Sequence, residues 1–114
     1  FCVPAFQYGM NLIYLFVIQL FNGYTMEKKV ERYLVNRVER MGGLCVKFPP
    51  LFFAGFPDRI VLLPGARIIF VETKDKGKKP TVLQVRIHGK LKGMGFRVEV
   101  LDRKESIDEF MLTL

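Results

Sequence analysis

The spacing of hydrophobic residues predicts an amphipathic helix at the start of the charged part of the chain. Over residues 27–41, apolar side chains recur three and four positions apart, with Glu, Lys and Arg on the opposite face. Gly42 and Gly43 follow, and glycine favours the end of a helix because it accepts the backbone conformation found there. The predicted inward-facing residues are Val30, Leu34, Val35 and Val38.

Three short β-like runs follow this helix. The first is stopped by Pro49 and Pro50, and a loop containing glycine and proline comes after it. A Pro64-Gly65 turn then separates two runs rich in Ile, Val, Leu and Phe, which predicts a hairpin. The predicted strands are residues 44–48, 59–63 and 67–72, with the loop at residues 51–57.

A second helix is predicted after a basic, glycine-containing loop at residues 75–80. The hydroxyl of Thr81 can cap this helix, which runs to about Met94, and Gly95 closes it. Its predicted apolar side is Val82, Val85, Ile87 and Leu91. The remaining predicted elements are a strand at residues 96–101 and a short helix from a Ser106 cap through Met111.

This element order predicts a mixed α/β fold. The first three strands can form a meander, whereas the fourth arrives by a helical crossover and should pair in parallel with an earlier strand. A mixed β-sheet flanked by helices, in the order α-β-β-β-α-β-α, is the expected architecture.

Residues 1–25 differ from the rest of the chain because they carry no charge. Uncharged runs of about 18 residues or more are transmembrane candidates. However, Pro4, Gln7, Asn11 and Gln19 interrupt this one, and no positive residue precedes it as a secretory signal would require. We interpret it as an apolar extension before a natural start at Met26, followed by one domain at residues 26–114. A membrane anchor is the less favoured alternative.

The charge of the chain favours a polyanionic partner. All 18 basic and 11 acidic residues lie at or after Glu27 and give a net charge of +7. Such an excess points first to nucleic acid and second to an anionic membrane surface. Cys2 and Cys45 are the only cysteines, so neither a zinc site nor an oxidising compartment is indicated. We expect a cytoplasmic protein that does not bind membranes.

Candidate chemistry gathers at the ends of two predicted strands. Asp58 opens one strand, and Glu72 and Lys74 close the next, with Thr73 between them pointing to the other face. The hairpin turn allows Asp58 to face Glu72. Two carboxylates and the backbone carbonyl of Thr73 would suit Mg²⁺ or Mn²⁺, and a lysine beside them can act on water or phosphate. Taken alone, Glu72-Thr73-Lys74 is more typical of a solvated strand tip than of an active site.

The order and spacing of these residues resemble a known nuclease family. Phe56-Pro57-Asp58 followed by Val71-Glu72-Thr73-Lys74 is similar to the PD-(D/E)XK motif. With the basic loop and then Gln84, the pattern resembles the stand-alone, phage-type VRR-NUC branch over residues 26–110. The resemblance implies a restriction-endonuclease-like fold and a Mg²⁺- or Mn²⁺-dependent endonuclease that cuts branched DNA such as Holliday junctions, in a bacterial or phage-infected cell. It also implies a homodimer.

The resemblance implies roles for individual residues. Asp58 and Glu72 would bind the metal with the carbonyl of Thr73, Lys74 would be the catalytic lysine, and Gln84 would lie near the site. A glutamate of the first helix would join them, and Glu27 and Glu31, one turn apart, both fit. Thr73 stands where leucine is common in this motif.

Further basic residues beside the site are candidate phosphate contacts. His88, one turn after Gln84, is expected to be partly exposed and uninvolved. The rival hypothesis is a basic DNA-binding module on a nuclease-like scaffold without turnover. The predicted DNA-binding residues are Lys76, Lys78, Lys79, Arg86 and Lys90.

Overall fold

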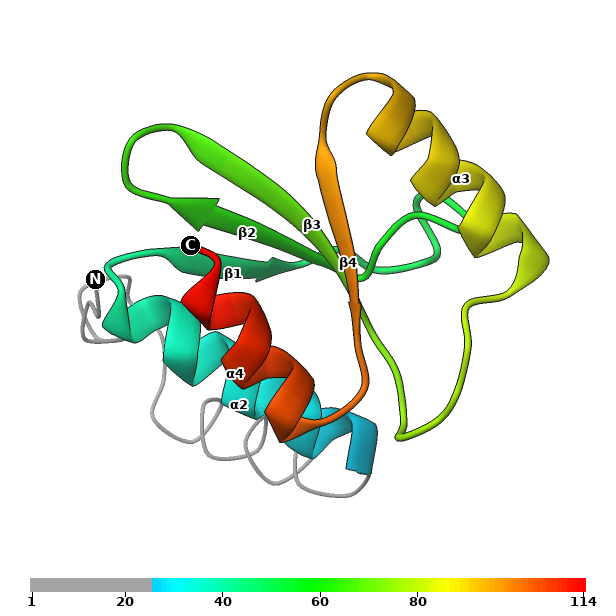
Figure 1. The fold of residues 1–114 in the computed structure, drawn as a ribbon. Coiled ribbons are helices and arrows are strands. Elements are labelled where there is room, and N and C mark those ends of the chain that lie inside the picture. Colours follow the sequence, from blue (N-terminus) through cyan, green and yellow to red (C-terminus); the bar gives the residue numbers. More distant parts are fainter. Residues whose placement is uncertain (1–25) are drawn as a thin grey trace, which may run out of the picture.

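Three helices and a four-stranded sheet make up residues 26–114, the part of the chain that the computed structural model describes (Figure 1). Side chains are described from Lys28 onwards. The predicted extension at residues 1–25 lies outside this part, and the division at residue 26 stays a prediction. The elements are α2 (Met26–Arg40), β1 (Leu44–Lys47), β2 (Arg59–Leu63), β3 (Arg67–Thr73), α3 (Val82–Gly93), β4 (Arg97–Leu101) and α4 (Lys104–Leu112).

The strands lie in the order β1-β2-β3-β4, which confirms the predicted topology. β1 and β3 both run antiparallel to β2, whereas β4 pairs in parallel with β3 after the crossover through α3. In the β2–β3 hairpin, Arg59 is opposite Val71. That register places Asp58 level with Glu72 at the end of the sheet where the predicted site lies.

One face of the sheet is covered by α2 and α4, which lie side by side in Figure 1. The inward residues of α2 that the helical spacing predicts are buried, with the exception of Val35, which is half-buried. This packing fixes the rotation of α2 and turns Glu31 towards the strands, where it pairs with Arg59. The buried cluster consists of Val30, Leu34, Val38, Val61, Leu63, Ile69, Val71, Leu101, Ile107, Phe110 and Met111.

The opposite face is covered by α3, and here the predicted apolar side is partly wrong. Val82 and Val85 are 89% and 58% exposed. The inner face of α3 carries Gln84 and His88 as well as the apolar residues Ile87 and Leu91. Polar residues occupy this face because the first turns of α3 lie over the predicted site, so hydrophobic spacing alone could not identify it.

The last helix also begins earlier than predicted. α4 starts at Lys104, and Ser106 lies within its first turn. The Ser106 hydroxyl accepts the backbone N–H of Arg103 at 3.2 Å and donates to the carbonyl of Arg103 at 2.7 Å. Ser106 therefore supports the start of the helix from inside it, instead of preceding it as an N-cap.

No helix within residues 26–114 is long and apolar enough to cross a membrane.

Candidate active site

Asp58 and Glu72 lie beside each other at the end of the β2–β3 hairpin, as the sequence predicts. The backbone N–H of Asp58 donates to Glu72 Oε2 at 3.2 Å. The Asp58 carboxylate in turn accepts the backbone N–H of Thr73 at 2.8 Å. The backbone of Asp58 therefore holds the Glu72 carboxylate, the backbone of Thr73 holds the Asp58 carboxylate, and the pairing of the two strands sets the distance between them.

Thr73 contributes its side chain as well as its backbone. Its hydroxyl is fully buried and donates to Asp58 Oδ2 at 2.5 Å. The same hydroxyl lies 3.5 Å from Glu31 Oε1 on α2. The sequence predicted a role only for the carbonyl of Thr73, so the contact of its hydroxyl was not predicted. The one feature of the sequence that could have indicated this contact is a threonine where the PD-(D/E)XK motif often has leucine.

Glu31 reaches the site from α2. Its side chain is buried and pairs with Arg59, whose guanidinium lies 2.7 Å from Glu31 Oε2, while the Lys47 ammonium lies 3.9 Å from the same oxygen. The side chain of Glu27 lies outside the described residues. Arg59 is a further component that sequence analysis did not assign, although it directly follows Asp58.

Lys74 and Gln84 both contact Glu72. The Lys74 ammonium lies 3.4 Å from Glu72 Oε1, and Gln84 Nε2 donates to the same oxygen at 2.9 Å. Gln84 can reach across because it is the third residue of α3. There it also forms a reciprocal capping pair with Thr81, with bonds of 2.9 and 3.2 Å.

Burial of the two carboxylates changes their acidity. Burial, together with the adjacent charge of Asp58, raises the pKa of Glu72 to about 7, although Lys74 opposes this shift. Burial also raises the pKa of Asp58, against the hydrogen bonds from Thr73. Burial therefore favours the protonated form of both carboxylates.

His88 is buried, and the expectation that it is partly exposed is wrong. It is 5% exposed, and its Nε2 has no hydrogen-bond partner among the described residues. Burial lowers its pKa, and the charges of Lys92 and Lys74 lower it further. The imidazole is therefore neutral at pH 7. Its burial follows from its position one turn after Gln84, on the face of α3 that packs on the sheet.

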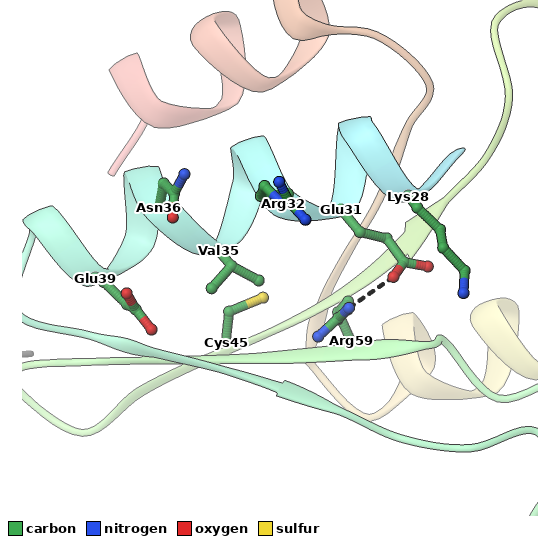
Figure 2. A pocket seen from close by; sticks show the side chains of 8 residues that line it. All are labelled: Lys28, Glu31, Arg32, Val35, Asn36, Glu39, Cys45 and Arg59. Carbon is green, nitrogen blue, oxygen red and sulfur yellow. Dashed lines mark hydrogen bonds and ion pairs between the residues drawn. The ribbon is translucent and has the colours of Figure 1, made fainter. Parts of the chain in front are cut away.

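A cavity of about 460 Å³ lies between α2 and the first two strands (Figure 2). Figure 2 shows Glu31 and Arg59 paired at one end of it and Glu39 towards the other. Asp58, Glu72 and Lys74 do not line this cavity, so the predicted site is separate from it and shares only the Glu31–Arg59 pair. The lining residues are Lys28, Glu31, Arg32, Val35, Asn36, Glu39, Cys45 and Arg59.

No family model matches the chain. A phage protein named "Putative nuclease p44", from Acyrthosiphon pisum secondary endosymbiont phage 1, is 44% identical over 79 residues, which cover 69% of this chain and 85% of the relative. A solved structure described as a VRR_NUC domain superposes with a TM-score of 0.74 at 34% identity and covers 78% of this chain and 97% of its own.

The chain belongs to the VRR-NUC family.

The VRR-NUC site has a donor set that fits a hard divalent cation. Among the described residues, no three His, Cys, Asp or Glu side chains form a group that could hold a metal ion by themselves. The two adjacent carboxylates, Asp58 and Glu72, would need a further oxygen donor, such as the backbone carbonyl of Thr73 at the strand end. Oxygen donors of this kind suit Mg²⁺ or Mn²⁺, and a bound cation would favour the ionised form of Glu72, whose pKa is raised mainly by burial.

The predicted DNA-contacting residues of this VRR-NUC chain are all exposed. Three of them lie on the loop between β3 and α3, and two lie on α3 itself. The loop is tied at Gly77, whose N–H donates to Asp102 at 2.9 Å. Its lysines are therefore held near the end of β4, the strand that pairs with β3 at Glu72. They are Lys76, Lys78 and Lys79, with Arg86 and Lys90 on the helix.

Proposed function

We propose that this chain is a metal-dependent endonuclease that hydrolyses phosphodiester bonds in DNA. The observation that carries the proposal is the position of Glu72: its Oε2 accepts the backbone N–H of Asp58 at 3.2 Å, and the Lys74 ammonium lies 3.4 Å from its Oε1. Two carboxylates and a lysine converging at a strand end are the groups that metal-assisted phosphodiester hydrolysis requires. The 44% identity to a phage protein named as a nuclease supports the same assignment.

Asp58, Glu72 and the carbonyl of Thr73 would hold Mg²⁺ or Mn²⁺. Such an ion, when bound, supplies positive charge to the phosphate and lowers the pKa of a water molecule. In hydrolysis the water oxygen bonds to phosphorus, the bond from phosphorus to the leaving sugar oxygen breaks, and that oxygen takes up a proton. We assign the orientation of the water, and stabilisation of the charge developing on the phosphate, to the ammonium of Lys74.

The neighbouring side chains would hold this arrangement in place. Gln84 restrains Glu72 by its 2.9 Å hydrogen bond, and Thr73 restrains Asp58 through both its N–H and its hydroxyl. Glu31 is a positioning residue that the Arg59 guanidinium fixes at 2.7 Å. Restraints of this kind typically decide whether ligating carboxylates keep a productive geometry.

We further propose that the substrate is branched DNA, such as a four-way junction, held by the lysines between β3 and α3 with Arg86 and Lys90. These exposed cations would neutralise phosphates and give affinity without base-specific reading.

We also propose a homodimer, because two sites are needed to cut two strands symmetrically. An apolar part of the sheet that α3 does not cover supports this. Leu44, Leu62 and Ile68 are directly paired across three strands and therefore share one face, and Leu44 and Ile68 are 50% and 44% exposed. Gel filtration with light scattering tests the dimer. A monomer, both free and on a four-way junction, would contradict it.

A cleavage assay on linear and four-way-junction DNA, with Mg²⁺ or Mn²⁺, tests the activity. We expect wild-type protein to cut the junction, and Asp58→Ala or Lys74→Ala to lower the rate about a hundredfold or more. Wild-type protein that binds DNA but never cuts would favour the rival, a non-catalytic DNA-binding module. Undiminished cleavage by both variants would move the site elsewhere.

A further inference from the structure

The loop between β1 and β2 exposes its most apolar side chains at its tip. Leu51 is 93% exposed, Phe52 75% and Phe53 51%. These three residues, here called the loop tip, are consecutive and carry no charge. An exposed group of large apolar side chains next to a functional site typically marks a binding surface.

The loop tip rests on an ordered base. The N–H of Phe52 donates to the carbonyl of Pro49 at 3.2 Å, and the N–H of Phe56 donates to the carbonyl of Phe53 at 3.2 Å. The Phe52 ring meets Phe48 edge-on at 6.1 Å between centroids. Phe48 in turn contacts Phe56, which packs on the core residue Phe70. The exposed ring of Phe52 is therefore the outer end of a row of rings anchored in the core.

The loop tip belongs to the same loop as the catalytic carboxylate. The loop is closed at its base by the N–H of Phe48, which donates to the carbonyl of Asp58 at 2.8 Å. On its other side the loop touches α3, because a Cβ at Gly55 would lie 2.8 Å from Leu83 and 3.0 Å from Ile87. A molecule bound at the loop tip would therefore contact a loop that ends at Asp58 and packs on the first turns of α3.

Charge around the loop tip selects the kind of partner. Residues 74–92, which include α3, carry seven basic side chains and one acidic, a net +6 of the +7 of the whole chain. Between Met41 and Pro57 the only charged residue is Lys47, which is basic. An apolar protein surface would pack on the rings but would offer no anionic group to the basic side chains. A nucleotide uses both, since its base can stack on an aromatic ring and its phosphate can meet a cation.

We propose that the loop tip is a nucleobase-binding site, at which the ring of Phe52 stacks on an unpaired base close to the phosphodiester bond that is cut. The inference rests on the proposed function in taking DNA as the ligand. It specifies the substrate further, because a fully paired duplex offers no free base face, whereas a junction, gap or single-stranded end does. Selectivity for branched DNA would then reside partly in residues 51–53.

Fluorescence titrations of the full chain in EDTA test this without any cleavage. The probes are a four-way junction with 2-aminopurine at an unpaired position beside the branch point and a linear duplex of the same length. Four variants are compared with wild type: Phe52→Ala, Phe52→Leu, Phe52→Tyr and, as a matched exposed apolar residue on α4, Leu112→Ala. Leu112 is 87% exposed.

Wild type and Phe52→Tyr should bind the junction probe equally and change its 2-aminopurine emission. Phe52→Ala and Phe52→Leu should bind it about fivefold to tenfold more weakly and leave the emission unchanged, while duplex affinity changes less than twofold. Leu112→Ala should behave as wild type.

Three results would overturn the inference. One is Phe52→Ala with junction affinity and emission like wild type. Another is that Phe52→Leu binds the junction and changes the emission as wild type does, because an aliphatic side chain would then replace the ring and the contact would not be stacking. The third is a change in oligomeric mass or in pelleting with anionic vesicles on Phe52→Ala, because the loop tip would then meet a second copy or a membrane. Should wild type show the Phe52-dependent emission change and yet never cut DNA, the inference stands and the nuclease proposal fails.

Discussion

At Glu72, burial and the neighbouring Asp58 act against an adjacent ammonium, and the pKa of about 7 records that balance. Because this pKa exceeds the usual value of 4.5, the folded protein binds more protons than the unfolded chain between these two values. The contribution of Glu72 to stability is therefore lost as pH rises through about 7. We expect wild type to lose about 1 to 3 kcal/mol relative to Glu72→Gln between pH 5 and pH 8.

Urea denaturation of both proteins in EDTA, at several pH values, measures this difference. Subtracting the free energy of unfolding of one protein from that of the other at each pH removes any effect of the glutamine that does not depend on pH. A difference that stays flat across this range would mean that the folded site stabilises the Glu72 charge after all. Added Mg²⁺ should reduce the slope, because a bound cation favours the ionised carboxylate.

The Thr73 hydroxyl is the second test at the scale of one residue. Thr73→Val keeps the shape and removes the donor that reaches Asp58 at 2.5 Å. We expect a loss of about 1–2 kcal/mol in the free energy of unfolding, because a buried carboxylate loses a partner. We also expect roughly a 10- to 100-fold weaker activation by Mn²⁺. Thr73→Ser keeps the hydroxyl and is the matched control. If both variants needed the same Mn²⁺ concentration for activation, the hydroxyl would have no part in positioning Asp58.

The sequence predicts some of these residues and not others, for physical reasons. Alternation along a strand and the hairpin turn are sufficient to place Asp58, Glu72 and Lys74 together. Glu27 and Glu31 lie one turn apart on the same face of α2, so which of them reaches the strands depends on where the helix lies along its axis on the sheet, and local sequence does not contain that. The side-chain contact of Thr73 and the burial of His88 depend on packing across the sheet, which no local pattern contains.

At the scale of elements, one residue at the N-terminus of α3, Gln84, both stabilises the start of the helix and contacts the candidate site. Gln84 caps the helix through its Oε1 and holds Glu72 through its Nε2. Hydrophobic spacing finds the length of this helix correctly and its buried face only in part. The polar residues on that face serve the site, whereas α2 is amphipathic in the ordinary way and its inner residues follow from spacing alone.

Gln84→Glu separates the two tasks of this residue. A glutamate at the third helical position still accepts the Thr81 N–H, so the helix start should be retained. Its carboxylate then faces Glu72 Oε1 in place of an amide donor. We expect DNA cleavage to fall about tenfold or more at pH 7, with helix content by circular dichroism unchanged. Gln84→Ala, which removes both bonds, is the comparison. If Gln84→Glu cleaved like wild type, the contact with Glu72 would have no part in the reaction.

At the scale of the whole molecule, the charge is concentrated on one segment. Residues 74–92 carry nearly all of the net positive charge, and this segment runs from Lys74 through α3. The helices α2 and α4 on the opposite face contain both signs of charge. Phosphates should therefore be held on the side of the sheet that presents Glu72, which orients the DNA towards the site.

This asymmetry predicts that the basic residues of 74–92 cause most of the salt dependence of DNA binding. Each phosphate contact contributes about 0.9 to the slope of log K against log salt concentration on duplex DNA. The double variant Lys78→Gln/Lys79→Gln should therefore lower the slope by about 2, measured by fluorescence anisotropy between about 50 and 200 mM salt in EDTA. The control, Lys29→Gln/Arg40→Gln, removes the same charge from exposed positions on α2. Its slope should stay within experimental error of wild type if phosphates contact the α3 side alone. Equal losses of slope in the two double variants would instead mean that DNA responds only to net charge, and the orientation argued from residues 74–92 would be wrong.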